Sequence, residues 1–85
     1  MDAVNKRIQQ LKEKYPDYLI LLRCDDEYQS YHEDAETISK CLNIRLFEIE
    51  GHKYCAFNYK NFDTYLRMLI KAGHKVALLE NILKQ

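Results

Sequence analysis

Six carboxylates and no basic residue lie between Cys24 and Ser39. Carboxylates bind magnesium, and paired carboxylates can divide the acid and base roles in catalysis. These acids are Asp25, Asp26, Glu27, Glu33, Asp34 and Glu36. Aspartate is also an ordinary turn residue, and acids are favoured in the first turn of a helix because the helix dipole stabilises them. We therefore interpret the six residues as an acidic interaction patch on the surface, without a bound metal ion.

Histidine, cysteine and serine occur without the spacing that a zinc or nucleophilic site requires. The histidines are His32, His52 and His74, and the cysteines are Cys24, Cys41 and Cys55. An odd number of cysteines without a C-x-x-C pair suits neither a disulfide framework nor a zinc site. Cys24 lies beside acids, which raise the pKa of a thiol and make it a poor nucleophile. We expect no enzyme, no cofactor and, because the thiols are unpaired, a cytoplasmic location.

The second half of the chain carries a row of basic residues. Residues 1–50 hold seven Lys or Arg against eleven Asp or Glu, a net charge of −4, whereas residues 51–85 hold six against two, a net charge of +4. Lys60, Arg67 and Lys71 fall on one helical face, and Lys75 extends the line. Such a basic row can follow the phosphates of DNA, although the polar face of any surface helix has the same pattern.

Other classes of protein are excluded by what the sequence lacks. The only glycines, Gly51 and Gly73, lie too far apart to form a phosphate loop or a dinucleotide-binding turn, so we expect no bound nucleotide. The longest apolar run, 18–22, is far shorter than the roughly 20 residues that cross a bilayer, so we expect no membrane association. With 85 residues, 47% of them hydrophobic, the chain should form a single domain over 1–85.

Hydrophobic spacing predicts the elements that position these residues. Helical spacing of apolar residues predicts helices over 4–15, 35–42 and 62–70, the second ended by Asn43 and the third by Gly73. Short runs of branched and aromatic residues predict strands over 18–22, 28–31, 44–49, 54–59 and 76–79, with a turn at 24–27 and an exit segment at 81–85. The fold class is therefore α/β (α+β), a mixed sheet of about five strands flanked by three helices in the order α-β-β-α-β-β-α-β.

Two of these elements carry more detailed expectations. The strand over 18–22 does not alternate between apolar and polar residues, which predicts burial on both faces of the sheet. The third helix should turn one apolar face to the sheet, formed by Phe62, Tyr65, Leu66, Leu69 and Ile70.

Taken in order, the residues resemble the N-terminal, mismatch-recognition domain of MutS DNA repair proteins. Residues 23–35, RCDDEYQSYHEDA, are similar to the family pattern R-M-G-D-F-Y-E-x-F-x-x-D-A. Residues 59–80 are similar to Y-x5-Y-L-x-x-L-x-x-x-G-x-x-V-A-x-x-E, and the opening Gln9-Gln10-Leu11-x-x-Lys14-Tyr15-Pro16 looks like the family's first helix. The resemblance covers almost the whole chain and implies the same mixed sheet with flanking helices.

The resemblance also implies a Phe-x-Glu motif that enters the minor groove of DNA. In the family, the phenylalanine stacks on a mispaired base and the glutamate forms a hydrogen bond to it. By position the motif becomes Glu27-Tyr28-Gln29, and the family's preceding glycine becomes Asp25. Glu27 cannot stack on a base, and Tyr28 should point to the opposite face of its strand. We expect that the mismatch wedge is lost, while Gln29 keeps an uncharged hydrogen-bonding group.

MutS proteins continue into connector, lever, clamp and ATPase domains, so we expect no ATPase in this chain, whether it is an orphan first domain or an excised part.

The sequence supports two hypotheses for the function of this chain. The first is a module of DNA mismatch repair that binds double-stranded DNA weakly through Lys60, Arg67, Lys71 and Lys75. The second is a protein-interaction module that uses the acidic patch against a basic partner such as a repair protein.

Overall fold

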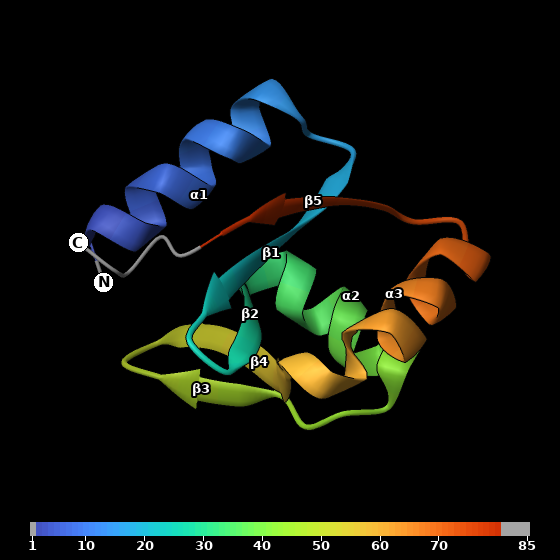
Figure 1. The fold of residues 1–85 in the computed structure, drawn as a ribbon. Coiled ribbons are helices and arrows are strands. Elements are labelled where there is room, and N and C mark those ends of the chain that lie inside the picture. Colours follow the sequence, from blue (N-terminus) through green and yellow to red (C-terminus); the bar gives the residue numbers. More distant parts are fainter. Residues whose placement is uncertain (1, 81–85) are drawn as a thin grey trace.

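The computed structural model describes residues 2–80. Its elements follow the predicted order, with a short 3-10 helix, η1, before the last helix (Figure 1). They are α1 (Asp2–Lys14), β1 (Tyr18–Cys24), β2 (Glu27–Tyr31), α2 (His32–Leu42), β3 (Phe47–Ile49), β4 (His52–Asn58), η1 (Tyr59–Asn61), α3 (Phe62–Lys71) and β5 (Lys75–Leu79). The predicted exit segment at 81–85 lies outside the described residues.

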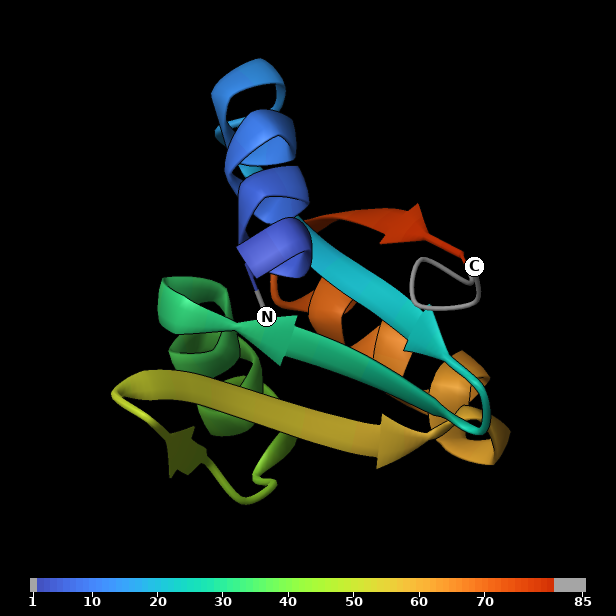
Figure 2. The same cartoon turned by 90° about the vertical axis from the view of Figure 1, so that its left-hand side faces the viewer.

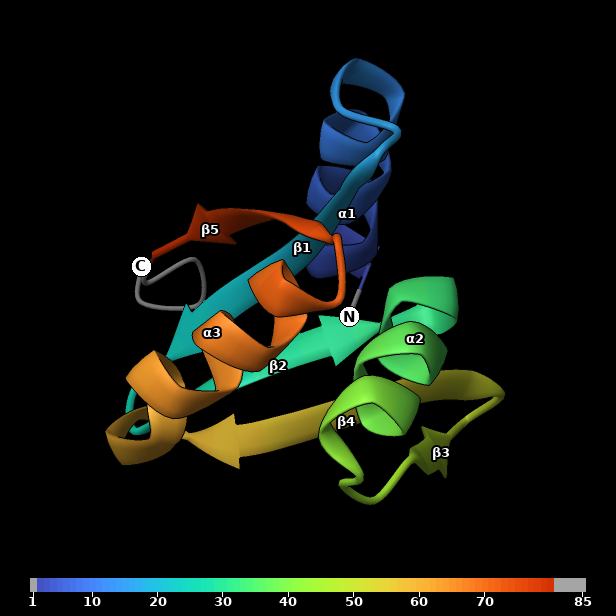
Figure 3. The same ribbon diagram turned by 90° about the vertical axis from the view of Figure 1, so that its right-hand side faces the viewer.

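The five strands form one mixed sheet in the order β3-β4-β2-β1-β5. Every neighbouring pair is antiparallel except β1 and β5, which run parallel. Helices α2 and α3 cover one face of the sheet, as Figure 3 shows, and α1 lies on the other face. The predicted fold class, a mixed five-stranded sheet with three helices, is confirmed.

The core has two parts, one on each face of the sheet. On the α2–α3 face, Leu21 packs with Ile38 and Leu69, and on the α1 face Ile20 and Leu22 pack with Val4 and Ile8. Adjacent residues of β1 are thus buried on opposite faces, as the run without alternation predicted. Helix α1 reaches mainly β1 and β5, so β2 and β4 remain uncovered on its side of the sheet (Figure 2).

The hairpin of β3 and β4 differs from the prediction. β3 has three residues, all exposed, and β4 begins at His52 instead of residue 54. The turn between them is Glu50-Gly51, with φ of 51° and 80°. Both turn residues are therefore left-handed, which is the geometry of a two-residue type I′ turn and aligns β4 with β3 directly after Gly51.

The apolar face of α3 is narrower than predicted. Leu69 is fully buried, but the side chain of Ile70 is 57% exposed. Each residue turns the helix by about 100°, so the residue after Leu69 points away from the sheet. None of the helices within residues 2–80 has the length and hydropathy needed to cross a membrane.

Candidate functional site

The start of β2 is fixed to the elements around it. Asp25 and Asp26 form the turn between β1 and β2, and φ of Asp25 is 52°. The backbone N–H of Tyr59 donates to the Asp26 carbonyl over 2.8 Å, and Arg23 Nε donates to the Asp25 carbonyl over 2.6 Å. The guanidinium of Arg23 also lies 4.8 Å from the centroid of the Tyr59 ring. The turn before Glu27 is therefore held against the start of η1.

Tyr28 belongs to the core and not to the surface. Its side chain is 5% exposed, and its ring stacks on Phe62 at 4.5 Å and on Phe57 at 5.6 Å between centroids. This placement confirms that Tyr28 points away from the face that carries Glu27 and Gln29, because successive residues of a strand alternate. The ring of Tyr28 is therefore part of the core and is not available at the surface.

Glu27, Gln29 and Tyr31 form a hydrogen-bonded row on the uncovered face of the sheet. Gln29 Nε2 donates to Glu27 Oε1 over 2.8 Å, and the Tyr31 hydroxyl donates to Gln29 Oε1 over 2.9 Å. Burial raises the pKa of Tyr31, and the nearby Cys24, Tyr54 and Glu27 raise it further, so the hydroxyl stays a donor. The amide of Gln29 therefore holds the Glu27 carboxylate in place.

Aromatic rings continue this row toward the edge of the sheet. Tyr31 stacks on Tyr54 with 5.9 Å between centroids, and Tyr54 stacks on Phe47 at 5.3 Å. Rings that face one another across strands contribute roughly 0.2–1 kcal/mol per pair. These rings stabilise the β3–β4 hairpin, whose strand β3 is short and exposed.

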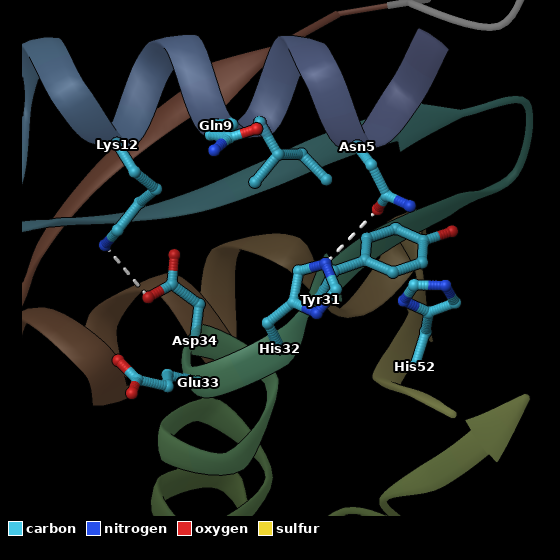
Figure 4. Close-up of a pocket in the computed structure, with 9 residues that line it drawn as sticks. Asn5, Gln9, Lys12, Tyr31, His32, Glu33, Asp34 and His52 are labelled. Carbon is cyan, nitrogen blue, oxygen red and sulfur yellow. Dashed lines mark hydrogen bonds and ion pairs between the residues drawn. The ribbon is translucent and has the colours of Figure 1, made fainter. Parts of the chain in front are cut away.

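Two adjoining hollows lie on this side of the sheet. The smaller, about 190 Å³ and called here the Glu27 hollow, is lined by Glu27, Gln29, Tyr31, Ile49, His52 and Tyr54. The larger, about 570 Å³ and called the α1 cavity, lies between α1, the end of β2 and the start of α2 (Figure 4). Tyr31 and His52 line both hollows, so the two lie next to each other.

Polar side chains border the α1 cavity, although the surface of its walls is mainly apolar. Figure 4 shows Asn5, Gln9 and Lys12 of α1 on one side, with Tyr31, His32 and Asp34 opposite them. His32 Nε2 and Asn5 Oδ1 lie 3.2 Å apart, within hydrogen-bond distance. The cavity can therefore supply both donors and acceptors to a bound group.

The fold also brings His32 and His52 together, which their spacing along the chain did not indicate. Their ring centroids are 5.4 Å apart in an edge-to-face arrangement. The β2–β4 pairing that sets Tyr31 opposite Tyr54 places them there. Within residues 2–80, no group of three or more histidine, cysteine or acidic side chains has the geometry to hold a metal ion.

The acidic patch is not one continuous surface. Asp25, Asp26 and Glu27 lie at the start of β2, whereas Glu33, Asp34 and Glu36 belong to α2, which begins after the other end of that strand. The five residues of β2 span about 17 Å. The prediction of a single patch over 25–36 therefore needs correction, since β2 separates its two halves.

For Asp34 the predicted surface position is wrong. Its side chain is buried, accepts the backbone N–H of Ile20 at 3.0 Å and pairs with Lys12 at 3.0 Å. Lys12 Nζ also donates to the Tyr18 carbonyl over 2.7 Å. Asp34 therefore joins the start of α2 to α1 and β1 and is not available to a partner.

Glu36 differs from Asp34 because it stays near the surface. It pairs with Lys53 of β4 at 2.6 Å. The hydrogen bond from Lys53 lowers the pKa of Glu36, and the same bond raises the pKa of Lys53. Its charge is thus largely balanced by Lys53 within the fold.

Three residues of the basic row lie on the adjoining elements η1 and α3, and the fourth does not. Lys60 of η1 and Arg67 and Lys71 of α3 are exposed. Lys75 begins β5, pairs in register with Tyr18, and its ammonium lies 5.8 Å from the centroid of the Tyr18 ring. Tyr18 packs on the α1 side of the sheet, so Lys75 lies around the β5 edge from α3. We call Lys60, Arg67 and Lys71 the η1–α3 row.

The three cysteines are free thiols. Burial raises the pKa of Cys24, and the neighbouring Asp25 and Glu27 raise it further. The predicted effect of the acids is thus confirmed, although burial contributes more. Burial also raises the pKa of Cys55 to about 11, which keeps this core thiol protonated at neutral pH.

Comparison with known proteins identifies the family. The model of the family MutS domain I matches residues 3–85. The chain belongs to the MutS domain I family. The DNA mismatch repair protein MutS of Thermosipho melanesiensis is 40% identical over 77 residues, which are 91% of this chain and 9% of that protein. The DNA mismatch repair protein MutS of Thermotoga neapolitana is 35% identical over 82 residues, 96% of this chain and 10% of that protein.

These matches confirm the resemblance found in the sequence motifs. The MutS domain I match includes Glu27-Tyr28-Gln29 as well as the η1–α3 row. The chain spans about a tenth of the length of these two relatives. The hollows described above therefore lie on the uncovered sheet face of a MutS domain I.

Proposed function

We propose that this MutS domain I acts in DNA mismatch repair and binds double-stranded DNA through the η1–α3 row. The observation that carries the proposal is the exposure of Lys60, Arg67 and Lys71 on adjoining elements. Neither ion pair formed within residues 2–80 uses any of the three. Their charges are therefore available to DNA phosphates, where each neutralised phosphate releases a counterion and favours binding.

The proposal includes the loss of the mismatch wedge. Glu27 occupies the position where the family carries phenylalanine, and Gln29 restrains its carboxylate. Tyr28 cannot replace the wedge without leaving its stack with Phe57 and Phe62. Binding should therefore depend on phosphate contacts, which carry no information about base pairing. We assign no nucleotide binding and no ATP hydrolysis to this domain.

Charge reversal at Arg67 tests the η1–α3 row. Three phosphate contacts should give a slope of about −3 in log affinity against log salt, and Arg67→Glu should reduce it by about one. The matched control is Lys40→Glu, which reverses an exposed basic residue of α2 outside the row. Fluorescence anisotropy with labelled duplex DNA measures both. Equal weakening by the two variants would show that the row is not the DNA-binding surface.

A further inference from the structure

We propose that the Glu27 hollow binds the arginine side chain of an extended, basic peptide segment. This site lies on the uncovered face of the sheet, and α3 packs on the opposite face. It is therefore distinct from the η1–α3 row, and the proposal does not depend on DNA binding.

The Glu27 carboxylate is suited to a cation from outside. It is half-buried and held by Gln29 Nε2 at 2.8 Å. No lysine or arginine within residues 2–80 forms an ion pair with it. A carboxylate that loses part of its hydration without gaining a cation is unfavourable, so a guanidinium that enters the hollow restores the balance. Each carboxylate oxygen can accept two hydrogen bonds, so the bond from Gln29 leaves capacity for the guanidinium.

The walls of the hollow favour arginine over lysine. Tyr31 and Tyr54 line it beside Glu27, and Ile49 adds an apolar surface for the methylene groups. A planar guanidinium can form two parallel hydrogen bonds to one carboxylate, whereas an ammonium is a point charge. Tyr54 stacks between Tyr31 and Phe47, so its ring offers apolar contact area to the arginine side chain and no free face for stacking. A volume of about 190 Å³ is below the roughly 300 Å³ at which pockets for small molecules begin. It suits one side chain.

The adjoining α1 cavity indicates how the rest of the segment would lie. Because the two hollows share Tyr31 and His52, a chain that places arginine at Glu27 can continue along β2 toward α1. There Asn5 and Gln9 present side-chain amides to the cavity (Figure 4), and amides can pair with peptide N–H and C=O groups. The five residues of β2 span about 17 Å, which matches an extended peptide of about five residues.

The test is a titration of the full ¹⁵N-labelled chain, followed by NMR. The probe is a five-residue peptide with a central arginine between alanines, blocked at both ends. Two control peptides carry lysine or citrulline instead, and citrulline keeps the shape of arginine without its charge. We expect saturable shifts at the amides of Glu27, Gln29, Tyr31 and Tyr54, at least about fivefold weaker binding of the lysine peptide, and no binding of the citrulline peptide.

Variants keep the result specific to Glu27. Glu27→Gln should weaken binding of the arginine peptide about tenfold, because it removes the charge but preserves the size of the side chain. Glu48→Gln is the matched control, an exposed glutamate of β3, which is separated from β2 by β4, and should leave the affinity unchanged. Equal affinity of the arginine and citrulline peptides, or of Glu27→Gln and the wild type, would overturn the proposal. Shifts of the same amides by duplex DNA but not by the peptide would also overturn it.

Discussion

Asp34 holds three elements of the domain together, and replacing it with alanine should destabilise the fold strongly. The variant leaves the buried N–H of Ile20 without its acceptor, which costs about 1–3 kcal/mol. It also removes the pair with Lys12, whose side chain is 33% exposed while that of Asp34 is 10% exposed. A pair that is partly in solvent contributes up to about 1 kcal/mol. The free energy of unfolding should therefore fall by about 1–4 kcal/mol.

Thermal unfolding followed by circular dichroism measures this loss. For a domain of this size, 1 kcal/mol shifts Tm by about 4–8 °C, so Asp34→Ala should lower Tm by about 4–30 °C. Asp34→Asn keeps an oxygen for Ile20 but loses the charge, so it should lie between Asp34→Ala and the wild type. The control Glu33→Ala removes the exposed acid next to it and should cost less than about 1 kcal/mol. If Asp34→Ala unfolds at the same temperature as Glu33→Ala, the structural role of Asp34 is refuted.

Three further predictions concern single positions. Glu50→Asn should raise the free energy of unfolding by about 0.5–1 kcal/mol in urea denaturation, because asparagine tolerates the left-handed conformation of this type I′ turn better than glutamate does; a loss would contradict the turn assignment. Ser30 has a fully buried hydroxyl for which residues 2–80 offer no hydrogen-bond partner, so Ser30→Ala should leave Tm unchanged or raise it. The matched control for this serine is Ser39→Ala, which removes a hydrogen bond to the Glu36 carbonyl and should cost about 1 kcal/mol. Burial raises the pKa of the Cys55 thiol to about 11 in the folded protein, from its ordinary value of 9.0, so its protonated form stabilises the fold below about pH 9. The advantage of the wild type over Cys55→Val should shrink as pH rises from about 9 to 11, and an advantage that stays constant would contradict this.

Local signals predicted the elements well because each has a local cause. Asn43 ends α2 in the left-handed conformation, with φ of 56° and its N–H donating to the Ser39 carbonyl, as its position in the sequence indicated. Gly73 follows α3 with φ of 93°. Helix α1 ends at Lys14, shortly before Pro16, because the residue before a proline avoids helical geometry. Such boundaries depend on one or two residues and can be read from them.

The arrangement of the site could not be predicted, because it depends on contacts between distant parts of the chain. Asp34 and Glu33 look alike in the sequence, since both are acids in the first turn of a helix. Asp34 is buried because it pairs with Lys12, 22 residues earlier, and accepts the backbone N–H of Ile20. Neither partner can be recognised from the sequence around Asp34. The proximity of His32 and His52 depends in the same way on which strands pair, and neither spacing nor composition specifies that β4 lies beside β2.

Lys75 shows a related limit of the sequence pattern. Lys75 follows Lys71 at helical spacing, but α3 ends at Lys71 and the chain turns at Gly73. Lys75 therefore belongs to β5 and lies around the edge of the sheet from α3. A spacing argument holds only as far as the helix continues. The helical spacing also predicted burial of Ile70, which is exposed because the sheet contacts only a narrow strip of α3.

Titration of the chain against matched and G·T-mismatched duplex DNA tests most directly whether this MutS domain I binds DNA without a mismatch wedge. Anisotropy is measured at about 50 mM and about 200 mM salt. With three phosphate contacts, affinity should fall about 40-fold between the two concentrations and should be equal for both duplexes. No binding at the lower salt concentration would contradict the role of the η1–α3 row. A tenfold preference for the mismatched duplex would contradict the loss of the wedge.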